Sequence, residues 1–360
     1  MHNLPTEEEL YWLELSLTPG VGIRRIRELS LAYGSLKEAV ASEREEKAGA
    51  DGRPQWKEKL KKAEKLLKAR AMWKLCGEKN IGILTPASPA YPAELKLIYD
   101  PPAALYYQGD LSVFQKPAAA MVGSRRCSGY GAQAAEAIAC RLAAGGMTIV
   151  SGMARGIDRF SHEGALKAGG ATIAVLGCGV DVCYPPEHRQ LHRQIAERGM
   201  LLSEFPPGTE AKPAHFPMRN RIISGLSKLV ILVEAGEKSG SLITADYALE
   251  QGREVYCVPG SFFSADNRGG HRLLQQGAAL LGGPEDVEEL CGRGNTRCKE
   301  EKKEEHWLLE AVSDFGSTPE TLCRETGRSP EVIQQTLTLL QIEGRIRIGP
   351  DGRIMKVQEL

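Results

Sequence analysis

Between about residues 80 and 290, short apolar runs alternate with helix-length segments, and this alternation constrains the fold more than any other feature of the sequence. Most of these runs are apolar throughout and do not alternate with polar residues. A strand that is apolar on both faces is typical of a parallel sheet with helices on each side. The expected strands are 118–122, 147–151, 171–177, 201–204, 228–234, 254–260 and 278–282. The sequence therefore predicts a doubly wound α/β domain that binds ligands beyond the carboxyl ends of its strands.

The flanking regions follow other patterns. Residues 1–75 are predicted to be helical, beginning at Thr6, which is followed by acidic residues that favour a helix start. The Pro-Gly-Val-Gly turn at 19–22 fits a helix-hairpin-helix, whose turn amides can hold a DNA phosphate, and also fits a simple αα-corner. The charged and small polar residues at 291–304 predict a linker. The last predicted domain, 305–360, reads helix, helix, helix, hairpin and resembles a winged helix. The predicted central domain is then 76–290.

Charge and cysteine content exclude several classes of protein. Lys plus Arg and Asp plus Glu both number 46, which excludes a wholly basic surface but allows a local basic groove. The first residues lack the basic and apolar regions of a signal peptide, and no apolar run is long enough to cross a bilayer. The nine cysteines form no CxxC pair. We therefore expect reduced thiols, a cytoplasmic location, no membrane partner and no metal.

The segment MVGSRRCSGYG (121–131) predicts a phosphate-binding turn between a strand and a helix. Unpaired backbone N–H groups at such a junction point toward one anion, and Gly123, Ser124 and Arg125 are the candidates to hold it. No Lys-Ser/Thr follows the glycines, so the segment is not a P-loop. The glycine spacing is wrong for a dinucleotide, and the second strand ends in Ser151-Gly152 and not in an acid. The sequence therefore predicts no nucleotide cofactor.

Two more loops of similar construction follow later strands, at 151–158 and 234–245. Because carboxyl ends of parallel strands share one edge of a sheet, the three loops are expected to form a row that can follow a polyanion. The residues of the two later loops that we assign to this row are Gly152, Arg155, Gly156, Ser239, Gly240 and Ser241.

The segment HFPMRNRIISGLS (215–227) supplies a fourth candidate element. Arg219, Asn220 and Arg221 begin a predicted helix, and both arginines are expected to reach the same edge as the three loops. An aromatic residue beside arginines, here Phe216, is the composition that stacks an unpaired base while the arginines hold its backbone. Two alternatives stay open. Phe216 can be a core residue, and the arginines can form salt bridges with sheet-edge acids such as Glu204 or Glu234.

Taken in order, several motifs resemble the DNA-processing protein A (DprA/Smf) family over roughly residues 80–285. They are GSRRCSGYG, SGMARGIDRFSHEGAL, LGCGVDVCYPPEH, SEFPPG, FPMRNRIISGLS and EAGEKSGSLITADYALEQGREVYCVPG. The resemblance implies an extended Rossmann-like domain with a mostly parallel sheet. It also implies an N-terminal helical domain, SAM-like or helix-hairpin-helix-like, and a C-terminal winged helix.

The same resemblance implies a homodimer, without enzymatic activity or cofactor, that binds single-stranded DNA, protects incoming DNA and loads RecA during natural transformation. It implies that Gly123, Ser124 and Arg125 bind phosphate. It further implies that Arg219, Asn220 and Arg221, with Phe216 and Lys212, line the adjoining groove. His271 departs from the family, which usually has Asn at that position.

Two other functions fit the residues. A Rossmann-like enzyme that binds or hydrolyses nucleotides could use Glu234 and Asp158 as its carboxylates, although the chain lacks the PGGxGTxxE loop of such hydrolases. A scaffold protein could instead dock partners on its flanking domains. The expected recognition helix of the winged helix, PEVIQQTLTLLQ, has no Lys or Arg, which favours a protein-contact or weakly DNA-touching module. His162 is expected to be a structural hydrogen-bonding residue, with a role in assisting a nucleophile left open.

Overall fold

The computed structural model describes residues 4–45, 65–291, 308, 311–312, 317–342, 346–349 and 353–356. The chain divides into two compact units, Met1–Gly294 and Asn295–Leu360. Apart from residue 291, the predicted linker 291–304 lies outside the described residues. The predicted domain boundaries therefore stay a prediction.

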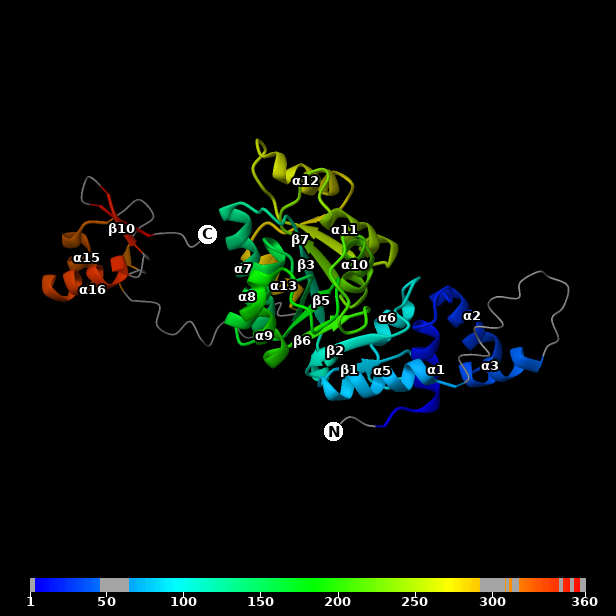
Figure 1. Cartoon of the computed structure of the whole chain (residues 1–360). Helices are drawn as coiled ribbons and strands as arrows, with labels where there is room; N and C mark the ends of the chain where they lie inside the picture. Colours follow the sequence, from blue (N-terminus) through cyan, green and yellow to red (C-terminus); the bar gives the residue numbers. More distant parts are fainter. Residues whose placement is uncertain are drawn as a thin grey trace. The chain divides into compact units, whose positions relative to one another are not determined.

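A nine-stranded sheet forms the centre of the first unit, in the order β1-β2-β6-β5-β4-β3-β7-β8-β9 (Figure 1). The strands predicted from the sequence are all present and parallel: β3 (Ala118–Val122), β4 (Thr148–Ser151), β5 (Thr172–Leu176), β6 (Met200–Ser203), β7 (Leu229–Leu232), β8 (Glu254–Cys257) and β9 (Ala279–Leu280). Two further strands, β1 (Gly82–Leu84) and β2 (Leu105–Gly109), extend the sheet antiparallel beyond β6. The expectation of a mostly parallel α/β sheet is thus confirmed.

Helices cover both faces of the sheet (Figure 1). Alternate residues of one strand belong to different cores: Val150 of β4 packs with α10 and α11, whereas Ile149 packs with α7 and α8. The first face carries α6 (Ala93–Leu97), α10 (His215–Gly225), α11 (Ser241–Glu250) and α12 (Arg268–Gln275). The second carries α7 (Gly129–Ala144), α8 (Ile157–Lys167), α9 (Arg189–Arg198) and α13 (Pro284–Leu290). Three 3₁₀ turns complete this region, η1 (Leu111–Gln115), η2 (Pro186–His188) and η3 (Ala265–Asn267).

Four described helices precede the sheet: α1 (Glu7–Ser16), α2 (Ile23–Tyr33), α3 (Leu36–Glu45) and α5 (Leu67–Glu78). α1 begins as predicted, with a capping box in which Thr6 and Glu9 satisfy each other's backbone N–H groups. The apolar side chains of α1, α2, α3 and α5 share one core with β1, β2 and α9. The Glu9 carboxylate also accepts a hydrogen bond of 2.6 Å from Ser88 Oγ, in the loop after β1. These helices therefore pack directly against the antiparallel edge of the sheet.

The described part of the second unit contains α15 (Pro319–Thr326), α16 (Pro330–Ile342) and the antiparallel pair β10 (Ile346–Ile348) and β11 (Ile354–Lys356). α16 begins at Pro330, as the Ser-Pro-Glu sequence predicts. Leu322, Ile333, Leu337 and Ile346 are buried in a core of their own. Residues 350–352, between the two strands of the predicted hairpin, lie outside the described residues. Across both units, no described helix is long and apolar enough to span a bilayer.

Candidate functional site

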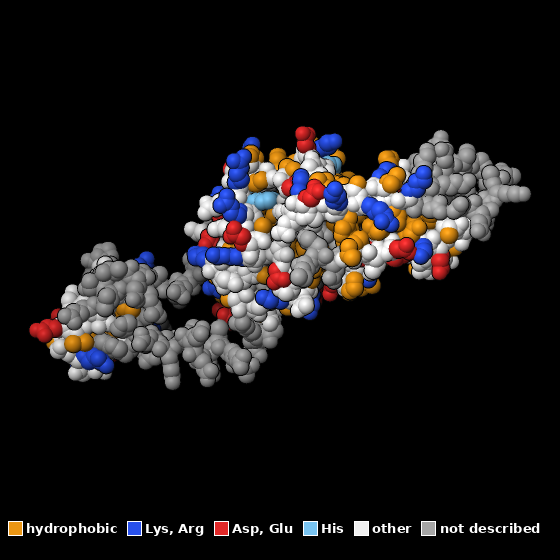
Figure 2. All heavy atoms as spheres, turned by 60° about the horizontal axis from the view of Figure 1, so that its bottom comes forward, with side chains coloured by type: hydrophobic (Ala, Val, Ile, Leu, Met, Phe, Trp, Pro, Cys, Tyr) orange, Lys and Arg blue, Asp and Glu red, His pale blue; other side chains and the backbone are white. Residues whose placement is uncertain are grey.

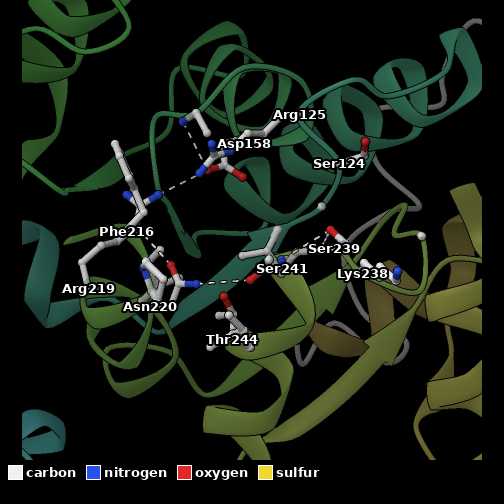
Figure 3. A pocket seen from close by; sticks show the side chains of 18 of the residues that line it. Ser124, Arg125, Asp158, Phe216, Arg219, Asn220, Lys238, Ser239, Ser241 and Thr244 are labelled. Carbon is white, nitrogen blue, oxygen red and sulfur yellow. Dashed lines mark hydrogen bonds and ion pairs between the residues drawn. The ribbon is translucent and has the colours of Figure 1, made fainter. Parts of the chain in front are cut away.

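A pocket of about 730 Å³ opens at the carboxyl ends of β3 and β7 (Figure 3). After β3 the chain builds the sheet outward through β4, β5 and β6, and then returns to add β7 on the other side of β3. Loops that follow strands on either side of such a reversal separate and leave a crevice, which is where ligands bind in open α/β sheets. Of the residues predicted for the site, nine line the pocket: Gly123, Ser124, Arg125, Phe216, Arg219, Asn220, Ser239, Gly240 and Ser241.

The loop after β3 is held by its neighbours through its backbone. Ser124 N–H donates to the Glu234 carbonyl at 2.7 Å, and the Ser124 carbonyl accepts from Ile157 N–H at 3.1 Å. Gly156, at the start of α8, has φ +72°, and a Cβ there would lie 2.2 Å from the Ser124 carbonyl oxygen. Only glycine fits this backbone and this approach. Gly156 therefore supports the loop from behind and does not itself line the pocket.

Glu234 is buried and already bonded. Its carboxylate accepts hydrogen bonds from Ser128 N–H, at 3.0 Å, and from the Ser128 hydroxyl, just before α7. Neither predicted arginine pairs with this carboxylate. Glu234 thus fixes the start of α7, and its carboxylate is not among the groups that line the pocket.

Arg219 lies under the pocket with only 3% of its surface exposed. Its Nη1 donates to the carbonyls of Gly152, at 2.6 Å, and Val175. Its Nη2 lies 3.8 Å from the Asp158 carboxylate, which lines the pocket and accepts from Ala154 N–H at 3.2 Å (Figure 3). Burial lowers the pKa of Arg219 to about 10, so it remains charged at neutral pH. Burial also raises the pKa of Asp158, an effect that Arg219 opposes.

Gly152 has a different role from the one predicted. A Cβ on Gly152 would lie 2.0 Å from Arg219 Nη2. The glycine therefore makes room for the guanidinium and gives it a carbonyl acceptor. It does not line the pocket.

The expectation that both arginines of α10 reach the same groove is wrong for Arg221. Its Nη1 and Nη2 form hydrogen bonds of 2.9 and 2.6 Å with the two Glu204 carboxylate oxygens. Its Nε donates to the Asp100 carbonyl at 2.8 Å. Arg221 is 6% exposed and does not line the pocket. The alternative of a salt bridge to Glu204 therefore describes this residue. Arg219 and Arg221 are two positions apart on the helix, so their side chains point in different directions.

Arg155 and Lys212 are also outside the pocket lining. Arg155 is exposed and forms an ion pair with Glu187, just before α9. Lys212 is exposed in the loop before α10. The next residue, Pro213, lines the pocket, whereas Lys212 does not.

Phe216 is half-buried, which lies between the two roles predicted for it, stacking on a base and packing in the core. The guanidinium carbons of Arg125 and Arg219 lie 5.3 and 5.9 Å from its ring centroid. The Tyr184 ring lies 5.4 Å away, centroid to centroid, at an interplanar angle of 40°. The ring thus packs with both arginines while forming part of the pocket wall.

Three pocket residues that carry positive charge are exposed: Arg125, Arg126 and Lys238. Within the described ranges, none of them forms an ion pair with a carboxylate. By contrast, Arg159, Lys167 and Arg221 are paired. On the face shown in Figure 2, positive and negative side chains are interspersed with hydrophobic ones, so no single sign of charge dominates there. At the pocket, Arg125, Arg126 and Lys238 supply positive charge that no carboxylate in the described ranges pairs with.

Sequence reasoning missed several pocket residues, including Tyr184, Lys238 and Thr244. Lys238 lies in EAGEKSGS, within the third predicted loop. A lysine directly before the Ser-Gly-Ser turn could have been predicted to bind phosphate with that turn. Tyr184 reaches the pocket from the loop before η2. Nothing in the local sequence distinguishes it from a core tyrosine.

The two histidines noted in the sequence both bond to the backbone near the pocket. His162 is fully buried, with Nδ1 at 2.7 Å from Thr172 Oγ1. Its Nε2 accepts from Met153 N–H at 3.3 Å, and Met153 has φ +61° in the loop after β4. His271 Nε2 lies 3.2 Å from the Gly260 carbonyl. The imidazole of His162 therefore positions the loop after β4 and does not line the pocket.

Acid is expected to destabilise the first unit through His162. Burial first, and then the nearby Arg219 and His188, lower the pKa of His162 to about 3. The unfolded chain binds a proton near pH 6.5, so between these values it holds more protons than the native state. The free energy of unfolding should therefore fall as the pH is lowered through this range, by up to about 1.4 kcal/mol per pH unit. Urea unfolding of the wild type and His162→Gln at several pH values measures this. Identical pH slopes for the two proteins would contradict the expectation.

No group of three or more His, Cys, Asp or Glu in the described ranges could hold a metal ion. The cysteines in those ranges are free thiols, and Cys298 lies outside them.

Comparison with known proteins gives consistent matches. The family model described as DNA recombination-mediator protein A matches residues 82–292. DNA processing protein DprA of Bacillus subtilis is 48% identical over 218 residues, which cover 60% of this chain and 73% of that protein. Protein Smf of Escherichia coli is 39% identical over 287 residues, covering 75% and 76%. These matches confirm the resemblance found in the ordered motifs.

Two solved structures match the fold. The X-ray structure of DprA from Streptococcus pneumoniae aligns with a TM-score of 0.67 at 34% identity, covering 80% of this chain and 98% of that one. A structure of DNA processing protein A from Helicobacter pylori, solved to describe its single-stranded DNA binding mode, aligns with a TM-score of 0.53 at 29% identity. That match covers 59% of this chain and 94% of the other.

Proposed function

This chain belongs to the DNA recombination-mediator protein A family. We propose that it binds single-stranded DNA in the pocket at the carboxyl ends of β3 and β7. The observation that carries the proposal is the group of unpaired cations, Arg125, Arg126 and Lys238, around a pocket that also contains Phe216. A positive groove beside an aromatic ring is the combination that binds an unpaired strand without reading its sequence. The Helicobacter pylori relative, described by its single-stranded DNA binding mode, supports the same ligand.

In the proposed complex the loop after β3 and the turn at 238–241 hold successive phosphates. Gly123 is essential to the close approach, because a Cβ there would lie 2.6 Å from Ile157 Cγ1 and 2.9 Å from the Glu234 carbonyl oxygen. Ser124, Arg125 and Lys238 supply the donors. A base then turns toward Phe216 and Tyr184. Asn220 connects the two sides of the pocket, because its side-chain amide donates a hydrogen bond of 3.4 Å to the Gly240 carbonyl.

The cellular role we propose is that of a recombination mediator that protects incoming single-stranded DNA and loads RecA during DNA uptake. We also propose that the protein is cytoplasmic and works as a homodimer without catalysing a reaction. Two exposed leucines beside the edge strand β9 support self-association: Leu249 is 58% exposed and Leu280 is 56% exposed. Large apolar side chains left exposed near a sheet edge are candidates for a contact surface.

For the flanking regions we propose a SAM-like or helix-hairpin-helix-like fold at the N-terminus and a winged helix at the C-terminus. α16 carries no Lys or Arg between Pro330 and Ile342, so it would gain little from counterion release on duplex DNA. We therefore propose that the C-terminal unit contacts protein, or touches DNA only weakly.

The competing function, hydrolysis of a nucleotide, finds little support in the two candidate carboxylates. Glu234 is bonded to Ser128, and Asp158 is buried beside Arg219. A general acid or base must reach a substrate proton, and Glu234 does not line the pocket. Release of free base from nucleoside monophosphates at a catalytic rate would instead support the hydrolase function.

A salt series on single- and double-stranded oligonucleotides tests the proposed function. We expect tighter binding of the single strand, with log K falling linearly with log salt by about 0.7 per phosphate neutralised. Three unpaired cations predict a slope near −2, measured by fluorescence anisotropy with labelled oligo-dT. Equal affinity for both forms, or no binding of oligo-dT at low salt, would contradict the proposal.

A further inference from the structure

Two adjacent phenylalanines, Phe262 and Phe263, project from the loop after β8 almost entirely into solvent. Their exposed fractions are 83% and 92%. The two rings meet edge to face, with centroids 5.4 Å apart and an interplanar angle of 86°, and neither has another aromatic partner among the described residues. Large aromatic side chains are normally buried, so two neighbouring rings left in water indicate a binding surface.

The segment that carries these rings, 259–267, is firmly anchored at its ends. The Tyr130 hydroxyl, at the start of α7, donates to the Pro259 carbonyl at 2.9 Å. His271 Nε2 lies 3.2 Å from the Gly260 carbonyl. Gly260 packs so tightly on the buried Asn267 that a Cβ would lie 2.2 Å from its Cγ. The rings are therefore held outward by an ordered loop, and a fixed platform loses little conformational freedom on binding.

The same segment forms part of the rim of the pocket. Asp266, three residues after Phe263, lines the pocket together with Gly236 and Lys238. The Ala265 carbonyl and Asp266 Cα lie 3.4 and 3.9 Å from the position that a Cβ on Gly236 would occupy. Gly269 N–H donates to the Ala235 carbonyl at 2.8 Å, which ties the segment to the end of β7. The loop that carries the ring pair therefore borders the Lys238 side of the pocket through Ala265 and Asp266.

Inside the pocket, the aromatic surface proposed to receive a base is that of Phe216 and Tyr184. Phe216 packs against Arg125, Arg219 and Tyr184 at centroid distances of 5.3, 5.9 and 5.4 Å. Phe262 and Phe263 have no such partners in the described ranges beyond one another. Their rings thus add a second, more exposed aromatic surface on a loop that contributes Asp266 to the pocket.

We propose that Phe262 and Phe263 stack the bases of the single strand where it leaves the pocket past Lys238. This inference rests on the proposed function, because it extends the same binding path. Every base offers a π-face, so such a platform tolerates any sequence. The exposed Asp266 carboxylate beside the rings repels phosphate, which favours bases over backbone at this point.

The test compares the full-length wild type with Phe262→Ala/Phe263→Ala on three probes: a ~4-nucleotide oligo-dT, a ~20-nucleotide oligo-dT and an abasic strand of the longer length. We expect the variant to bind the long oligo-dT about tenfold more weakly or worse, and the short and abasic strands as the wild type does. Tyr99→Ala is the matched control, since that ring is 75% exposed on the segment after α6 and does not line the pocket. It should leave all three affinities unchanged.

Unchanged affinity of the double variant for the long oligo-dT would overturn the inference, as would equal losses on the abasic strand. A change in oligomeric mass by light scattering, with DNA binding intact, would assign the rings to a protein contact and overturn it as well. Failure of the proposed function is distinct, because then the wild type itself would bind none of the probes.

Discussion

Replacing Arg125 with alanine is expected to weaken binding of a ~20-nucleotide oligo-dT by about ten- to a hundredfold, the cost of about 1.5–3 kcal/mol for a hydrogen bond to a charged group. Arg125 is exposed on the pocket rim, and no carboxylate in the described part of the chain pairs with it. Its removal breaks no ion pair but gives up the contact with the Phe216 ring, so urea unfolding of the variant accompanies the binding measurement. The salt slope should also become shallower by about 0.7, since one phosphate contact is lost. Fluorescence anisotropy across a salt series measures both quantities.

Arg155→Ala is the matched control for that experiment. Arg155 is likewise an exposed arginine in a loop after a neighbouring strand, but it pairs with Glu187 and does not line the pocket. We expect its affinity and salt slope to stay close to those of the wild type, because an exposed ion pair contributes only about 0–1 kcal/mol. Equal losses for Arg125→Ala and Arg155→Ala would show that the pocket does not define the binding path.

Replacing Asp158 with alanine is expected to lower the free energy of unfolding by about 3–5 kcal/mol. The carboxylate is buried 3.8 Å from Arg219 Nη2, and Arg219 is itself only 3% exposed. Without Asp158, the guanidinium would remain buried with carbonyl partners but without an opposite charge. Urea unfolding of the full chain, with the midpoint and slope both recorded, measures the loss.

Glu163→Ala provides the comparison on the same helix, α8. Glu163 pairs with Arg159 at the surface at 2.8 Å, so its loss should cost no more than about 0.5 kcal/mol. Combining Asp158→Ala with Arg219→Ala should cost less than the sum of the single changes, because the second removes the charge that the first left unpaired. A small effect of Asp158→Ala, comparable to that of Glu163→Ala, would disprove the structural role assigned to this pair.

Much of the sheet was predictable because burial on both faces leaves a local signature. β5 and β7 read as unbroken apolar runs, and both are parallel strands covered by helices. β1 and β2 were not predicted. β1 has only three residues and β2 ends in exposed positions, so neither shows a pattern long enough to distinguish it from a loop.

Part of the candidate site could be predicted for a similar reason. Gly123, Ser124 and Arg125 follow a strand directly, so their place at the carboxyl edge follows from the chain itself. Arg221 and Arg155 could not be assigned, since their partners Glu204 and Glu187 lie 17 and 32 residues away in the sequence. Whether a cation is free for DNA depends on such distant partners.

The sequence by itself determined the α/β class, the parallel strands and the identity of the family, because these depend on local periodicity and on ordered motifs. Tertiary structure alone decided which charges remain free. It buried Arg219 beside Asp158, paired Arg221 with Glu204 and left Arg125, Arg126 and Lys238 at one pocket. The physical reason is that the electrostatic state of a side chain depends on its neighbours in space and on its exposure to water. Neither the neighbours of a side chain nor its exposure to water is fixed until the strand order brings distant loops together.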